Sequence, residues 1–109
     1  MITSIVVRTQ MVDFHKYENA PEEVAFLRNN HRHVFHIEAK IEVWDDDREL
    51  EFFIVQNHIN SVLFQLSSES SCEMKAKKLL KLLIEKYGIN RRYQVSVFED
   101  NENGAEVIY

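Results

Sequence analysis

The stretch from Val34 to Trp44 constrains the fold most, because apolar and polar side chains alternate along it almost without exception. Side chains of an extended chain point to opposite faces in turn, so one face of this stretch is apolar and the other is polar. Such a strand is typical of an antiparallel sheet that has one face on a core and the other toward solvent or a partner. The apolar face comprises Phe35, Ile37, Ala39, Ile41 and Val43.

The other periodic segments predict three more strands and two helices. Alternation predicts strands over Ile5–His15, Tyr93–Val97 and Ala105–Tyr109. Apolar residues at helical spacing predict one helix from Ile54 to Leu66 and a second from Cys72 to Tyr87. The order is therefore β-β-α-α-β-β, which predicts an α+β fold with two helices on one face of an antiparallel sheet.

Local signals predict where these elements begin and end. Pro21 can open a short helical turn between the first two strands. Ser70 is expected to cap the second helix in a capping box with Glu73. After the polar turn at Asp45–Arg48, the segment Glu49–Phe53 is expected to run a short way back along the strand.

Length and composition bound the class of protein. A chain of 109 residues with ordinary apolar content is expected to form one domain over residues 1–109. The net charge of -5 argues against nucleic acid as a partner, because phosphate binding needs a basic surface. No apolar run approaches the ~20 residues of a membrane span, and the first residues lack a signal-peptide pattern. The single cysteine excludes an internal disulfide, which suits a reducing compartment. We therefore expect a cytoplasmic protein without a nucleic-acid or membrane partner.

Three histidines lie where the first two predicted strands face each other. His31 and His33 share one face because they are two residues apart, and His15 ends the preceding strand. Three neutral imidazoles leave a fourth position open, which is the usual arrangement of a catalytic zinc site. Two alternatives stay open: a chance cluster, and an anion site in which Arg28 and Arg32 join the histidines.

The order of elements and several short motifs resemble the 6-pyruvoyltetrahydropterin synthase and 6-carboxytetrahydropterin synthase family, which has the tunnelling fold. Phe14-His15 and His31-Arg32-His33 stand where that family carries its zinc ligands. The segment from Ser71 to Ala76 is similar to the start of its second helix, and Val95 to Glu99 is similar to its C-terminal strand motif. The resemblance implies that His15, His31 and His33 bind zinc.

The resemblance also implies a ligand and an assembly. Glu99 stands where the family's glutamate holds the pterin ring, and its two oxygens match a pair of N–H donors on a pterin- or purine-like heterocycle. The alternative is a solvated carboxylate at a strand end. Family members pair strand edges between subunits, with ligand sites at the interfaces, so a homo-oligomer is expected; unpaired sheet edges favour the same conclusion.

The departures from the family pattern concern its catalytic groups. The family's cysteine lies about four residues before the two histidines, and Leu27 is there instead. Arg32 replaces a glycine, and Asn57-His58 is the only counterpart of an Asp-His pair. Cys72 is expected to be a small core residue that cannot replace the missing thiol. Without a thiolate or a positioned base, the proton transfers of the synthase reaction lose their usual agents.

Three hypotheses follow. The first is a divergent, zinc-binding member of the family that recognises a pterin- or purine-like ligand and lacks the conventional synthase reaction; if it is an enzyme, it is a zinc-dependent lyase. The second is a non-enzymatic homo-oligomer that sequesters a small molecule or nucleotide, with Arg28 and Arg32 on its phosphate. The third is a structural oligomer whose histidines have no function.

Overall fold

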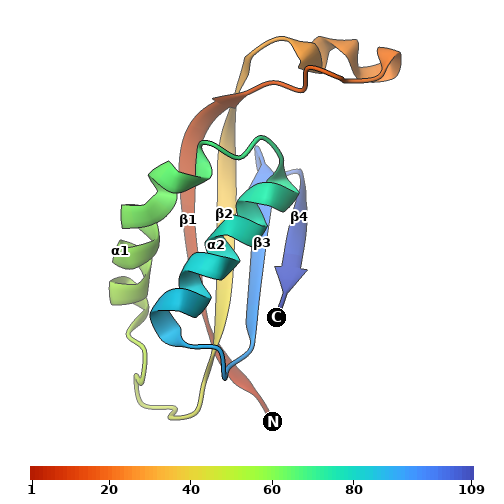
Figure 1. The fold of residues 1–109 in the computed structure, drawn as a ribbon. Helices are drawn as coiled ribbons and strands as arrows, with labels where there is room; N and C mark the ends of the chain where they lie inside the picture. Colours follow the sequence, from red (N-terminus) through yellow and green to blue (C-terminus); the bar gives the residue numbers. More distant parts are fainter.

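A computed structural model describes residues 1–109 and shows a mixed α+β structure built on one four-stranded antiparallel sheet (Figure 1). The strands lie in sequence order, and each pairs with the next. They are β1 (Thr3–His15), β2 (His31–Val43), β3 (Tyr93–Glu99) and β4 (Asn103–Ile108). The helices are η1 (Glu22–Arg28), α1 (Phe52–Val62), η2 (Leu63–Leu66) and α2 (Cys72–Tyr87), of which η1 and η2 are 3-10 helices.

The predicted α+β class and the antiparallel sheet are confirmed, while the order of elements differs from β-β-α-α-β-β. The 3-10 helix η1 lies between β1 and β2, and η2 follows α1 directly. Pro21 precedes η1, as expected for a residue whose fixed φ suits the start of a helical turn. No helix of the chain is long and apolar enough to cross a membrane.

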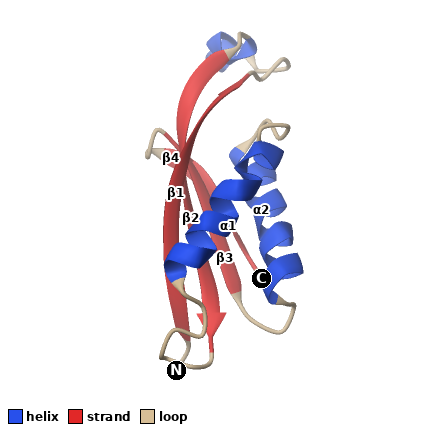
Figure 2. Cartoon of the chain, turned by 90° about the vertical axis from the view of Figure 1, so that its left-hand side faces the viewer, coloured by secondary structure: helices blue, strands red, loops and turns tan.

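Helices α1 and α2 cover one face of the sheet and leave the other face bare (Figure 2). Every second residue of β2 from Phe35 to Val43 is apolar and points into the core, and each of these is at most 7% exposed. Their burial contributes roughly 1.5–3 kcal/mol for each large side chain. The residues of α2 in the same core include Cys72, Ala76, Leu79 and Leu83.

Two local predictions are wrong, because in both places side-chain oxygens accept hydrogen bonds from backbone N–H groups. Ser71 caps α2 in place of Ser70, because its hydroxyl accepts a hydrogen bond from the Met74 N–H at 3.1 Å. The segment Glu49–Phe53 does not run back as a strand. The Glu49 carboxylate accepts from the N–H groups of Trp44 and Asp45, and the Glu51 side chain caps α1, so side chains use the backbone donors near this turn.

The hairpin of β1 and β2 extends past the ends of the helices, and η1 connects its two strands at the far end (Figure 1). In the register of this hairpin, His15 pairs with His31 and Asp13 pairs with His33. Because side chains alternate, these residues continue the face that forms the core further along both strands. The hairpin therefore places a group of polar side chains at one end of the core.

Candidate metal centre and adjacent pocket

His15, His31 and His33 converge at the end of the β1–β2 hairpin, as the sequence predicted. Each offers a ring nitrogen within 4.8 Å of the nitrogens of the other two. Their ring centroids lie 4.5, 4.8 and 5.1 Å apart, and the rings meet edge to face. The three side chains thus surround one point.

The Nδ1 atom of each histidine lies at hydrogen-bond distance from a different fixed oxygen. The partner is the Ser70 carbonyl for His15 at 2.6 Å, the Asn29 carbonyl for His31 at 2.7 Å, and Oδ2 of Asp100 for His33 at 2.6 Å. Carbonyl and carboxylate oxygens only accept, so Nδ1 donates, and in the neutral imidazole Nε2 then keeps its lone pair. Metal-binding histidines are held in the same way.

Two of the Nε2 atoms have no hydrogen-bond partner although they are buried, namely those of His31 and His33. A buried polar atom without a partner costs about 1–3 kcal/mol, so native structures contain few of them. A metal ion bound by the lone pairs would remove this cost. Three imidazole nitrogens suit zinc, and they leave a coordination position for water or a ligand. The residues present therefore fit a zinc ion.

Glu99, the last residue of β3, lies beside the three histidines. Its Oε1 is 3.5 Å from Nε2 of His15, and its Oε2 is 3.6 Å from Nε2 of His33. Register places it opposite Phe35, the first core residue of β2 after the histidines. The predicted ligand-binding carboxylate and the three predicted metal ligands therefore meet at one place.

Asp100 is a site residue that the sequence analysis missed. It follows Glu99 directly, and hydrogen bonds from His33 and from the Val34 N–H lower the pKa of its carboxyl group below the usual range. It is therefore an ionised acceptor at neutral pH. An Asp-Asn pair after a strand predicts a turn, and this was its only signal in the sequence.

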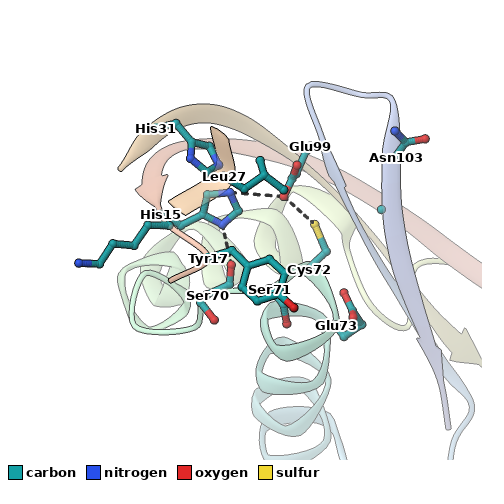
Figure 3. A pocket seen from close by; sticks show the side chains of 12 residues that line it. His15, Tyr17, Leu27, His31, Ser70, Ser71, Cys72, Glu73, Glu99 and Asn103 are labelled. Atoms are coloured by element: carbon teal, nitrogen blue, oxygen red, sulfur yellow. Dashed lines mark hydrogen bonds and ion pairs between the residues drawn. The ribbon is translucent and has the colours of Figure 1, made fainter. Parts of the chain in front are cut away.

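A cavity of about 520 Å³ opens next to the histidines (Figure 3). This volume lies within the range of ligand sites in proteins. His15, His31 and Glu99 line one side, and Leu27 and Cys72 are among the other lining residues. Leu27, where a thiol was expected from the resemblance, thus borders the pocket with an apolar side chain.

Cys72 is buried with the core, as predicted, and it also borders the pocket. Its Sγ lies 4.0 Å from Oε1 of Glu99. Burial, and the negative charges of Glu99 and Glu73, raise the pKa of the thiol to about 11. At neutral pH this group is therefore a protonated thiol and a weak nucleophile.

Arg28 and Arg32 do not join this group. Arg28 donates from two guanidinium nitrogens to the Ala20 carbonyl, at 2.9 and 2.7 Å, and pairs with Glu22 at 3.0 Å. Arg32 lies between two histidines on β2, so its side chain points to the opposite face of the sheet. Neither residue lines the pocket, and their predicted contact with a ligand stays a prediction. Lys16 is the cationic residue that lines the cavity.

No protein-family model matches the sequence, and no curated protein matches it either. The function must therefore be inferred from the residues of the site and their geometry.

Proposed function

We propose that this chain is a zinc-binding protein that holds a pterin- or purine-like heterocycle beside the metal, as a divergent relative of the 6-pyruvoyltetrahydropterin synthase family with a tunnelling fold. One observation supports the proposal most. The Nδ1 atoms of His15, His31 and His33 each face a fixed acceptor, while their ring nitrogens converge and two buried Nε2 atoms have no partner.

Glu99 is the proposed contact for the heterocycle. Its carboxylate lies beside the histidines and lines the pocket with them, where its two oxygens can accept a pair of parallel N–H donors. Zinc, when bound, would act as a Lewis acid on a carbonyl or hydroxyl oxygen of the ligand. The remaining lining residues would orient the ring and exclude water from one of its faces.

The pocket lacks a reactive nucleophile, which supports the proposal that the conventional synthase reaction is absent. Leu27 cannot transfer a proton, and the raised pKa keeps Cys72 protonated. These two residues also favour the second candidate function, a binding protein that retains its ligand unchanged. Arg28 already donates from Nε and Nη2 to Ala20 and Glu22, so these bonds fix its side chain and leave only Nη1 for a phosphate.

We further propose a homo-oligomer. Strands β1 and β4 form the two edges of the sheet, and edge strands carry backbone groups that can pair with another chain. Apolar side chains also lie on the face without helices, including Val12 at 53%, Phe14 at 57% and Ile108 at 71% exposure. Sedimentation equilibrium should give a mass above that of one chain; a monomer at micromolar concentration would contradict this part of the proposal.

Metal analysis tests the zinc site directly. The purified protein is dialysed against zinc, and bound metal and affinity are measured by mass spectrometry and calorimetry. We expect tight binding in the wild type and its loss in the His31→Ala, His33→Ala variant. The matched control is His36→Ala, because His36 lies on β2 but points to the opposite face. The proposal fails if the wild type binds no zinc, or if the double variant binds it as tightly.

A second experiment tests the ligand site. Pterins and purines are titrated into the zinc-loaded protein, with thermal shift and calorimetry as readouts. Glu99→Gln should lower the affinity by roughly tenfold or more, because an amide offers one acceptor where the carboxylate offers two. Glu102→Gln in the adjacent exposed turn is the control. Equal binding by both variants would contradict the role of Glu99.

A further inference from the structure

Asp100 holds two consecutive residues of β2 through three hydrogen bonds. Its Oδ2 lies 2.6 Å from Nδ1 of His33, and its Oδ1 accepts from the Val34 N–H at 2.9 Å. Its own N–H donates to the Val34 carbonyl at 2.7 Å. Side chain and backbone therefore fasten the β3–β4 turn to the strand that carries His31 and His33.

A tight turn with an unusual backbone brings Asp100 to this position. Asp100 and Asn101 have positive φ angles of 52° and 58°, and the Glu102 N–H closes the turn on the Glu99 carbonyl at 2.9 Å. Asp and Asn tolerate this left-handed conformation better than most residues. The regular β2–β3 register ends at the pair Phe35 and Glu99, so Asp100 reaches His33 from just beyond the strand.

His33 differs from the other two histidines in its partner. His15 and His31 face backbone carbonyls, which are neutral and are supplied by Ser70 and Asn29. His33 faces a carboxylate, and a charge-assisted hydrogen bond of this kind is about twice as strong as a neutral one. A carboxylate partner also raises the basicity of the imidazole toward a metal.

We propose that Asp100 is the positioning residue of the zinc site: its carboxylate fixes His33 in the Nδ1–H tautomer and aims Nε2 at the metal. This inference rests on the proposed zinc site. The alternative is that Asp100 only stabilises the turn. The two roles are separable because the turn can keep its left-handed backbone without the carboxylate.

Three variants distinguish the positioning role of Asp100 from a role in the turn alone. Asp100→Gly removes the carboxylate and adopts a positive φ without strain. Asp100→Asn keeps the backbone preference and one neutral acceptor. Asn101→Gly is the matched control, because it makes the same backbone change at the next position of the same turn. Zinc affinity is measured by competition with a chromophoric chelator.

We expect Asp100→Gly to weaken zinc binding roughly 10–100-fold, Asp100→Asn to give a smaller loss, and Asn101→Gly to stay close to the wild type. Nitrogen NMR of the metal-free proteins gives a readout that a turn role would not change. His33 should be the Nδ1–H tautomer in the wild type and in Asn101→Gly, and a mixture of tautomers in Asp100→Gly.

Two results would overturn the inference: equal zinc affinity in Asp100→Gly and Asn101→Gly, or an unchanged His33 tautomer in Asp100→Gly. Thermal unfolding of the metal-free variants shows whether both glycine changes affect the fold equally. If the wild type binds no zinc, the proposed function fails, and the tautomer measurement still decides whether Asp100 orients His33.

Discussion

Lys75 on α2 tests how a buried charge stabilises the end of the core that lies next to the site. Its ammonium is fully buried. The Nζ atom donates to the carbonyls of Leu66, at 3.1 Å, and of Glu69. It also lies 3.4 Å from Oδ2 of Asp13 and 4.8 Å from the centre of the Phe35 ring.

Lys75→Met keeps the length and the apolar stem of the side chain and removes only the ammonium. Two carbonyls and the Asp13 carboxylate then lose their donor. Breaking a buried pair by removing one partner costs about 3–5 kcal/mol. The Asp13 contact is long and its side chain is 16% exposed, so we take the lower end, about 3 kcal/mol. For a chain of this length, the melting temperature should fall by roughly 10–15 °C.

Urea and thermal unfolding of the metal-free protein measure this loss. Lys77→Met, on the exposed side of the same helix, is the control and should change the free energy of unfolding by less than about 0.5 kcal/mol. The variant Lys75→Met, Asp13→Asn should recover part of the loss, because it removes the uncompensated carboxylate. If Lys75→Met is as stable as Lys77→Met, the ammonium does not stabilise this end of the core and the reasoning is refuted.

Three further predictions test single contacts. Cys72 should react slowly with iodoacetamide at neutral pH in the folded protein and rapidly in urea, and equal rates in the two states would contradict its burial. Because folding raises the pKa of this thiol to about 11, its contribution to the free energy of unfolding is complete below the unfolded pKa and disappears as the pH rises through about 11. Gly104→Ala should destabilise by about 2 kcal/mol or more in urea unfolding, because the new Cβ would lie 2.1 Å from the Val97 carbonyl oxygen, and a normal midpoint would contradict this close approach. Ser71→Ala should lower the free energy of unfolding by about 1 kcal/mol, and Ser70→Ala should lower it much less. The opposite ranking in urea unfolding would show that Ser70 is the cap.

Periodicity predicted the elements of the fold because it follows from local geometry. The alternation along β2 has a period of two, and burial of every second residue from Phe35 to Val43 agrees with it. The burial of Lys75 could not be predicted in this way, because it depends on carbonyls that η2 and the following loop bring to the same place. Ser70 and Ser71 are both good N-cap residues, and the choice depends on the residue at which α2 begins, which is Cys72.

The site was predictable where strand geometry alone determined it. A pair of histidines two residues apart shares a face, and the antiparallel hairpin brings His15 opposite His31. The same rule places Arg32 on the opposite face, so its inclusion with the histidines followed nearness in sequence more than geometry. Asp100 could not be predicted, because its contact depends on positive φ angles and on where the β2–β3 register ends.

The partners of the three Nδ1 atoms show why few side chains are needed to orient the three histidines. Two of the acceptors are backbone carbonyls, from the connection before β2 and from the loop before α2. Any residue supplies a carbonyl, so these positions can change without loss of the hydrogen bond. Only the histidines and Asp100 must be specified by side chain. Leu27 and the protonated Cys72 border the pocket and take no part in these three hydrogen bonds, so the arrangement of the histidines does not depend on them.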